Sequence, residues 1–259
     1  MVGQGLTNMI GNAITGGGPA VGGGGGAFTN LYSAEFDGLD DYIATDSTYS
    51  VLDGQTKMSI SLWFYPTTTT LYQILFSTVR DSTANNFQIM ATFNNYKQIR
   101  FFTKDTGKYT LSNLNVFTVN AWNHVVITLD VSLSPVSDRC RIYVNGTDQT
   151  GGSTNQTITA LETSNSTMSF GINQNNKYNE FTGKLDEVAV WSGTMLTPSE
   201  VNDLYNGGTP TDLSTFSTPP SNWWRMGDNN GGTGTVLSDA IGSASATLIN
   251  GTSYSTDVP

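Results

Sequence analysis

Acidic residues gather near the start of the chain, and their spacing makes them the first candidates for chemistry. From residue 35 the sequence reads Glu-Phe-Asp-Gly-Leu-Asp-Asp, which places carboxylates at Glu35, Asp37, Asp40 and Asp41. Paired carboxylates can act as a general acid and a general base. Carboxylate oxygens are also the hard ligands that calcium prefers. This segment is therefore a candidate for either kind of site.

Calcium binding is the more specific of these two predictions. Asp37, Asp40 and Asp41 crowd one turn, so we expect them to act as calcium ligands. Asp186 lies on a later strand that is expected to run nearby, and it is the fourth predicted ligand. The alternative is that Asp37 and Asp41 accept backbone N–H groups within their own turn.

Other reactive residue types are scarce. His124 is the single histidine, which leaves a catalytic triad or a histidine metal site with little support, and its alternation with Trp122 predicts a sheet-face residue. Cys140 is the single cysteine and cannot form an internal disulfide. Its two flanking arginines could lower its pKa, but the surrounding strand pattern favours a structural cysteine. No glycine-rich run is followed by the Lys-Ser/Thr of a phosphate-binding loop.

Aromatic residues beside amides are the remaining candidates, because sugar binding needs an exposed ring next to hydrogen-bonding groups. Strand aromatics are more often part of a core, so loop tyrosines carry most of this prediction. The candidates are Tyr96, Tyr109, Tyr178 and the Trp223/Trp224 pair, flanked by Asn94, Asn95, Asn175 and Asn176.

Composition excludes several classes of partner. The 259 residues include only 12% charged residues, with a formal net charge of −10. Such an acidic chain is not expected to bind nucleic acid or an anionic membrane surface. No apolar run is long enough to span a bilayer, and the N-terminus lacks the basic region of a secretory signal. The length fits one large β domain with tails, or two small domains.

The elements that must position these residues read mainly as short strands from residue 31 to residue 208. Ile60, Leu62 and Phe64 alternate onto one face, and Val125, Ile127 and Leu129 do the same. Asn145-Gly146 is a strong hairpin turn signal. Strands are predicted at 32–36, 59–65, 74–76, 87–93, 99–102, 122–129, 141–144, 168–172 and 185–191. Many short strands separated by turns at this rhythm indicate a sandwich or a jelly roll.

One helix is predicted after the last of these strands. Thr197 can cap it, Pro198 suits its first position, and Glu200 can reach back to the cap backbone. Gly207 can end it in a left-handed conformation. Three apolar residues then share one face, namely Val201, Leu204 and Tyr205.

The two ends of the chain differ from this β region. The apolar residues Leu6, Met9, Ile10 and Ala13 fall at helical spacing before a flexible glycine-rich run at 16–26. We interpret 1–30 as a docking segment and linker that orders against a partner, with a frayed tail as the alternative. Residues 209–221 read as a connector, and strands are expected at 222–226 and 246–249.

Taken in order, several motifs resemble the concanavalin A-like, laminin G-like jelly-roll domains. These motifs are Phe36-Asp-Gly-Leu-Asp-Asp-Tyr-Ile43, Met58-Ser-Ile-Ser-Leu-Trp-Phe64, Trp122-Asn-His-Val-Val126, Ile142-Tyr-Val-Asn-Gly146, Gly183-Lys-Leu-Asp-Glu-Val188 and Leu196-Thr-Pro-Ser-Glu-Val201. The resemblance covers roughly 31–208 and implies an all-β, two-sheet antiparallel sandwich with one short helix. That superfamily holds lectins, glycanases, adhesion modules and virion proteins, so the fold alone does not give the function.

Three expectations come with this resemblance. The segment 223–251 looks like a piece that many such domains carry before their Phe-Asp-Gly segment, so 209–259 is predicted to complete the sandwich in this chain, to pair with a neighbour, or to form a separate appendage. The acids at 35, 37 and 40 come close to the Glu-x-Asp-x-x-Glu motif of related glycanases, but the last position is Asp, and the motif lies in the opening segment. We therefore predict a protein that is not an enzyme. Calcium-bearing relatives add support to the acidic turn.

A further resemblance concerns context. The segments Tyr205–Pro210 and Trp223–Asp228 look like parts of structural proteins of tailed phages, particularly marine ones. This resemblance implies a virion protein made in the host cytoplasm. Such a protein would dock on capsid or tail proteins, act in many copies or as a homo-oligomer, and adhere to host glycans. The alternatives are a free-standing calcium-dependent carbohydrate-binding module and a degenerate glycanase.

Overall fold

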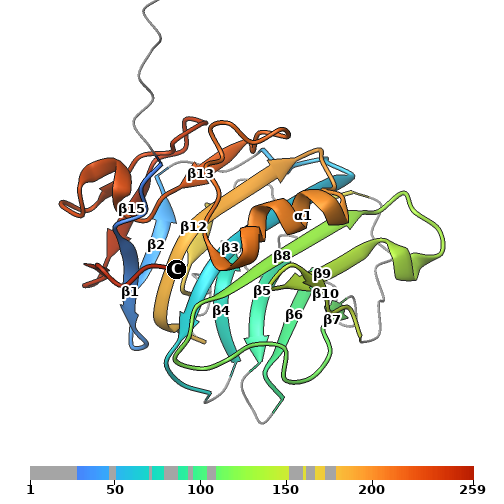
Figure 1. Cartoon of the computed structure of the whole chain (residues 1–259), viewed down its shortest axis with the longest axis horizontal. Coiled ribbons are helices and arrows are strands. Elements are labelled where there is room, and N and C mark those ends of the chain that lie inside the picture. The colour runs from blue at the N-terminus through green and yellow to red at the C-terminus, as the bar shows by residue number, and fades with distance from the viewer. Residues whose placement is uncertain are drawn as a thin grey trace, which may run out of the picture.

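The computed structural model describes residues 28–46, 51–69, 72–78, 87–92, 96–103, 109–151, 160–161, 167–172 and 179–259. Two antiparallel sheets pack face to face, and one short helix crosses the outer side of the first sheet (Figure 1). Each sheet has eight strands within this part of the chain. The all-β, two-sheet jelly-roll prediction is therefore confirmed.

The first sheet is built around two long strands that pair with each other at its centre. In spatial order it contains β10 (Thr147–Asp148), β9 (Cys140–Val144), β8 (Asn123–Asp130), β3 (Lys57–Pro66), β12 (Thr182–Ser192), β1 (Ser33–Asp37) and β16 (Ser253–Ser255). An eighth strand, β13 (Asn222–Trp224), pairs with β12 beside the start of β1. The β9–β10 hairpin turns through Asn145 and Gly146, both with positive φ, as the sequence predicts.

The second sheet lies behind the first in the view of Figure 1. In spatial order it contains β14 (Val236–Leu237), β15 (Ala246–Ile249), β2 (Tyr42–Thr45), β11 (Ser169–Phe170), β4 (Tyr72–Ser77), β5 (Phe87–Thr92), β6 (Gln98–Thr103) and β7 (Tyr109–Leu111). Short 3-10 helices are η1 (Val136–Asp138), η2 (Asn206–Gly208) and η3 (Asp228–Asn230).

The main core fills the space between the sheets, and residues from both sheets point into it. Ile60, Leu62 and Phe64 of β3 all belong to this core. Val125, Ile127 and Leu129 of β8 also belong to it, so both predicted alternations are confirmed. Cys140 lies in the same core, where burial raises the pKa of its thiol to about 12. It is therefore a structural cysteine rather than a reactive one.

A second apolar cluster covers part of the outer face of the first sheet. Helix α1 (Pro198–Tyr205) packs Val201 and Leu204 into it, against Trp191 of β12 and Trp223 of β13. The predicted capping box is present, since Thr197 and Glu200 hydrogen-bond to each other's backbone N–H. The helix ends through two left-handed residues: Asn206, with φ of 45°, is the cap, and Gly207, with φ of 66°, takes the predicted left-handed conformation directly after it.

The C-terminal strands complete both sheets within this one chain. β13 and β16 add to the first sheet, whereas β14 and β15 add to the second. Trp224 of β13 and Leu248 of β15 contribute to the main core. The strands of segment 222–255 are therefore part of both sheets and do not form a separate appendage.

Among the described residues, no helix has the length and hydrophobicity that crossing a bilayer requires.

Candidate functional site

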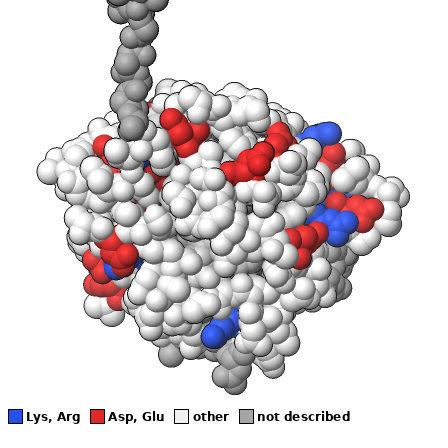
Figure 2. All heavy atoms as spheres, in the orientation of Figure 1, with Lys and Arg blue, Asp and Glu red and all other residues white. Residues whose placement is uncertain are grey.

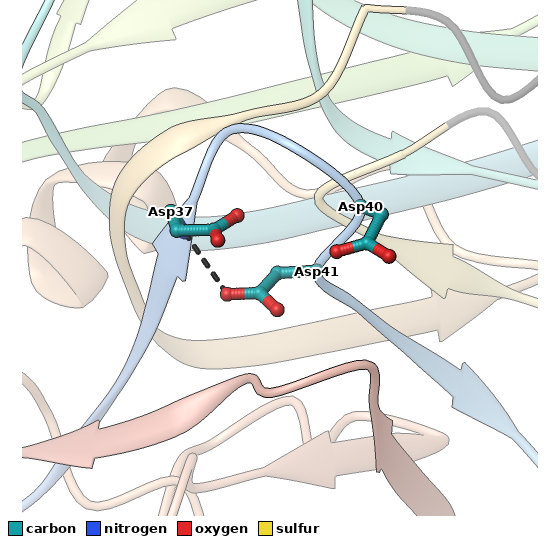
Figure 3. Close-up of side chains that lie close together, drawn as sticks. All are labelled: Asp37, Asp40 and Asp41. Carbon is teal, nitrogen blue, oxygen red and sulfur yellow. Dashed lines mark hydrogen bonds between the residues drawn. The ribbon is translucent and has the colours of Figure 1, made fainter.

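The acidic turn joins β1 to β2, and it brings three of the four predicted metal ligands together. One carboxylate oxygen from each of Asp37, Asp40 and Asp41 lies within 4.8 Å of the others. Figure 3 shows the three carboxyl groups beside one another, with Asp37 at the end of β1 and Asp41 just before β2. The turn is closed by internal bonds: Asp37 N donates to Asp41 Oδ2 at 3.0 Å, and Leu39 N donates to Asp37 Oδ1 at 2.8 Å.

These two bonds confirm that Asp37 and Asp41 accept backbone N–H groups in their own turn. They use only Asp41 Oδ2 and Asp37 Oδ1, so the other carboxylate oxygens of the cluster do not take part in them. Asp41 is only 4% exposed, and its Oδ1 atom is buried. This oxygen nevertheless accepts no hydrogen bond from the described residues. Burial raises the pKa of Asp41, and the neighbouring carboxylates of Asp37 and Asp40 raise it further. A cation would offset both effects, because it favours the charged carboxylate.

A pocket of about 270 Å³ opens beside this turn. The loop from β15 to β16 forms its other wall, and Asn250 Nδ2 fixes the two loops together by donating to the Asp40 carbonyl at 3.0 Å. Gly251 has φ of +116°, and a Cβ there would lie 3.1 Å from Asp41 Oδ1. Glycine therefore leaves the approach to this oxygen open. The lining residues are Glu35, Phe36, Asp37, Asp41, Asn250, Gly251 and Ser253.

Asp186 lies elsewhere, so the fourth predicted ligand does not join the turn. It is fully buried on β12, four positions beyond Thr182, which is the residue paired with Asp37. Its carboxylate accepts from Asn30 Nδ2 at 2.9 Å and from the Glu187 backbone at 2.8 Å. The prediction failed because the sequence shows that β12 is a strand but does not show its register against β1.

Asp186 instead belongs to a buried charged cluster. β12 has a bulge at Glu187, whose φ is 48°. At this bulge, the strand that pairs with one edge of β12 changes from β1 to β13. Arg225 pairs with Glu187 and also with Asp228, with 2.8 Å between Nη2 and Asp228 Oδ2. Burial raises the pKa of Glu187 to about 7, and burial together with Glu187 raises that of Asp186 well above its ordinary value.

The glycanase-like acids do not form an enclosed catalytic pair. Phe36 points into the main core, so Glu35 and Asp37 project from the outer face of β1, where both are exposed. One oxygen of Asp37 is already used by the turn. Catalysis by two carboxyls requires both to flank a bound glycosidic bond, and these two lie on the open rim of the pocket instead.

The predicted aromatic candidates divide into buried and exposed residues. Trp223 and Trp224 are 3% and 0% exposed, so the tryptophan pair belongs to the interior and is not a sugar platform. Tyr96 is 55% exposed, and the Arg100 guanidinium lies 4.6 Å from the centre of the Tyr109 ring. The other members of this prediction, Tyr178 and the four flanking asparagines Asn94, Asn95, Asn175 and Asn176, lie outside the described residues, as does the predicted docking cluster Leu6, Met9, Ile10 and Ala13.

His124 pairs with a serine but has no catalytic setting. Its Nε2 lies 2.7 Å from Ser61 Oγ, and its ring centre lies 4.8 Å from that of Trp63 and 6.1 Å from that of Tyr205. Burial lowers its pKa to about 3, so the imidazole is neutral. No carboxylate among the described residues bonds to Nδ1, which is itself buried without a partner. The predicted sheet-face role is confirmed.

Charged side chains form small separate groups on the surface. Figure 2 shows acidic groups scattered over a face that is otherwise mostly uncharged.

Sequence reasoning missed Asn250 and Ser253, because they lie about 210 positions from the turn that they help to enclose. Only the pairing of β16 with β1 brings Ser253 opposite Glu35.

Comparison with known proteins gives one family match and several structural matches. The family described as the concanavalin A-like lectin/glucanases superfamily matches residues 36–202. Comparison with curated proteins found no sequence match. A candidate carbohydrate binding protein from Bacteroides ovatus is similar in structure, with a TM-score of 0.66 and 19% identity. The match covers 90% of this chain but 62% of the Bacteroides chain.

Two smaller proteins share the same fold. A heptameric SAP-like pentraxin from Limulus polyphemus has a TM-score of 0.55 and 15% identity, over 85% of this chain and 94% of the pentraxin. The CBM40 domain of a Ruminococcus gnavus IT-sialidase, bound to α2,3-sialyllactose, has a TM-score of 0.51 and 12% identity. That match covers 69% of this chain and 100% of the domain.

Proposed function

The chain belongs to the concanavalin A-like lectin/glucanases superfamily, and from that membership we propose that it is a non-catalytic carbohydrate-binding module with a calcium site at its acidic turn. The pocket beside the turn is the proposed sugar site. Two structural neighbours support this function: one is described as a candidate carbohydrate binding protein, and the other was solved with a sialylated sugar.

The observation that carries the proposal is the oxygen chemistry of the turn. Three carboxylates offer ligand atoms within 4.8 Å of one another, and Asp41 Oδ1 is buried without a donor. Calcium prefers such oxygen ligands and takes six to eight of them, more than the turn alone provides. Asp37, Asp40 and Asp41 would hold the ion. When bound, the ion would offer its remaining positions to sugar hydroxyls.

The protein groups around the pocket would then orient the sugar. The Glu35 carboxylate can accept from hydroxyls, and the Ser253 hydroxyl can both donate and accept. The exposed position of Glu35 and Asp37 supports binding rather than hydrolysis, because hydrolysis by two carboxyls requires both to flank a bound glycosidic bond. Incubation with laminarin should release no reducing sugar.

A glycan array tests the proposal directly. The full-length chain should bind a subset of glycans in millimolar calcium and lose that binding in a chelator. Asp41→Asn should lose it as well, whereas the matched change Asp203→Asn, at an exposed position on α1, should keep it. Binding that survives both the chelator and Asp41→Asn would rule out the calcium site. An array without any calcium-dependent signal would rule out the function as stated.

Display on a virion is a second proposal, and it concerns setting rather than chemistry. The sequence feature that supports it is the apolar segment at 6–13, followed by a glycine-rich linker, ahead of a folded lectin-like domain. Mass spectrometry of purified tailed-phage particles should then detect this chain. Deletion of residues 1–26 should abolish its incorporation while the domain stays folded, and retention on the particle after the deletion would contradict the docking role.

A further inference from the structure

A row of side chains crosses the outer face of the first sheet, away from helix α1. The strand registers place Ser253 of β16 beside Glu35 of β1, Glu35 beside Lys184 of β12, and Lys184 beside Tyr65 of β3. The row then continues to Trp122, which directly precedes β8, since Phe64 pairs with Asn123. Their chain neighbours Phe64 and Leu185 are in the main core, so this row faces outward.

The tail of the chain lies on this row and places a carboxylate on it. Asp257 Oδ2 accepts from Lys184 Nζ at 2.7 Å, and Asp257 Oδ1 accepts from Trp122 Nε1 at 3.2 Å. The ammonium also lies 4.9 Å from the centre of the Tyr65 ring. In Figure 1 the C-terminus lies in front of the sheet, close to β12. The tail therefore shows what the Lys184–Trp122 pair can bind: one carboxylate, held by a cation and an indole N–H.

We propose that Lys184 and Trp122 form a carboxylate subsite for an acidic saccharide, and that Asp257 occupies this subsite when no saccharide is bound. The saccharide class is a sugar acid, such as a uronic or a sialic acid, linked to neutral sugars. This inference rests on the proposed carbohydrate-binding function and gives it a ligand class. It adds a second part to the binding surface, because Glu35 and Ser253 belong both to the row and to the pocket at the acidic turn.

The polarity of the row specifies which way such a ligand would lie. Lys184 is the single cation of the row, whereas Glu35 and the acidic turn at the opposite end would repel a second carboxylate. The acidic sugar therefore belongs at Lys184, and neutral hydroxyl-bearing sugars belong at Glu35 and Ser253. Four inter-strand steps of about 4.8 Å give the row a length of roughly 19 Å, enough for a short oligosaccharide.

The aromatic residues favour a saccharide over an acidic peptide. Tyr65 and Trp122 lie edge to face, with 5.7 Å between ring centres and 67° between planes, and both are half-buried. Such rings can pack against the C–H face of a sugar next to the bound carboxylate, as apolar rings with a polar edge do at wet surfaces. A peptide strand would instead need free backbone groups at a sheet edge, and Lys184, Tyr65 and Trp122 lie on or beside β12, β3 and β8 in the middle of the sheet.

Asp257 can leave the subsite without unfolding the tail. Its side chain is 47% exposed, and its backbone is held separately, because Asp257 O accepts from Ser33 Oγ at 2.7 Å and Asp257 N donates to Ser255 Oγ at 3.1 Å. Rotation of one short side chain would therefore free Lys184 and Trp122. Solvent reaches the ion pair from the Asp257 side and weakens it, so a ligand carboxylate with additional sugar contacts can compete with it.

Titration of the full-length chain with D-glucuronate and N-acetylneuraminate, followed by NMR, tests the subsite. The indole N–H signal of Trp122, assigned with Trp122→Phe, should shift with either sugar acid but not with glucose. Asp257→Asn removes the internal carboxylate and should tighten binding by about tenfold. Lys184→Met should abolish it. The matched change Lys57→Met, which breaks the ion pair with Asp130 elsewhere on the sheet, should leave it unchanged.

The outcomes separate this inference from the proposed function. Unchanged affinity in Asp257→Asn, or retained binding in Lys184→Met, overturns the subsite. An N-acetyl-aspartate amide that binds as tightly as the sugar acids overturns the saccharide assignment. Asp41→Asn should still bind glucuronate, since Asp41 is not part of the row. Loss of glycan-array signals in Asp41→Asn together with retained glucuronate binding supports both conclusions, whereas array binding without any glucuronate binding leaves only the proposed function standing.

Discussion

Arg225 and Glu187 form an ion pair inside the protein, with 3.2 Å between Nε and Oε1. This pair lies where the edge partner of β12 changes from β1 to β13, so it joins the chain's first described residues to its C-terminal part. Arg225 also donates to the Thr29 carbonyl, and its guanidinium lies 4.7 Å from the centre of the Phe28 ring. Two carboxylates pair with this one guanidinium, those of Glu187 and Asp228, and a third, that of Asp186, lies next to Glu187.

The excess of buried carboxylates predicts that stability falls as the pH rises. Burial raises the pKa of Glu187 to about 7 in the folded state, against 4.5 for the ordinary group. The folded state therefore binds more protons than the unfolded state between these values, and the free energy of unfolding decreases across that window. We expect a decrease of ~2 kcal/mol from about pH 5 to about pH 8, measured by urea unfolding with tryptophan fluorescence.

Glu187→Gln should flatten this pH dependence, because the variant side chain does not titrate. Asp203→Asn, an exposed change on α1, is the control and should leave the slope as in the wild type. Asp186 and Asp228 also have raised pKa values, so part of the slope should remain in Glu187→Gln. A stability that rises steadily over this pH range would contradict the argument.

Calcium should raise the melting temperature through the acidic turn. An ion that binds only the folded state stabilises it by about 2.7 kcal/mol when its concentration is 100 times its Kd. Differential scanning fluorimetry with and without calcium measures this shift. Asp41→Asn should remove the calcium response and should not lower stability in the chelator, because it removes a carboxylate whose pKa is raised by burial and by like charges. A chelator-insensitive melt of the wild type would show that the turn is purely structural.

The capping box of α1 should contribute about 1 kcal/mol. Thr197→Ala removes the side chain that accepts from Glu200 N, and it also removes the partner of the Glu200 carboxylate. Chemical unfolding should show the loss. Ser199→Ala, within the same exposed first turn, is the matched control and should change stability by only a few tenths of that amount. Equal effects of the two changes would mean that the cap is not responsible.

Removal of residues 209–259 should abolish cooperative unfolding. The deletion takes away β13 and β16 from the first sheet and β14 and β15 from the second. It also removes core side chains, among them Trp224, which is fully buried. Deletion of residues 1–26 is the comparison and should leave the melting temperature nearly unchanged. Calorimetry distinguishes the two variants, and a truncated chain that melts like the full-length protein would show that the C-terminal strands are dispensable.

Much of the fold could be predicted from local patterns, because those patterns depend on near neighbours. The alternation in β3 and β8 placed the correct residues in the core. Thr197, Pro198 and Glu200 predicted the start of α1, since a cap is defined within four residues. The Asn145-Gly146 turn was predictable for the same reason. In each case the energy that selects the structure comes from residues close in the chain.

The site depended on contacts that no local pattern encodes. Asp186 was expected near the acidic turn, but the register of β12 against β1 places it in the buried cluster with Glu187. Trp223 and Trp224 were candidates for an exposed platform, and the β12–β13 pairing buries both. Asn250 reaches the turn from about 210 positions away. Such placements follow from sheet register, which single-sequence patterns leave open.

The pairing of the first strand with the last determines how the domain would respond to mechanical load. Ser33 at the start of β1 lies opposite Ser255 at the end of β16. The segment before β1 and the segment after β16 therefore leave from the same end of this antiparallel pair. A force that pulls these ends apart would act on the hydrogen bonds of that pair in succession and peel β16 away at low force. A force applied between the N-terminal end and a ligand on the outer face would not act on the β1–β16 pair alone. It would act on many hydrogen bonds of the sheet at the same time.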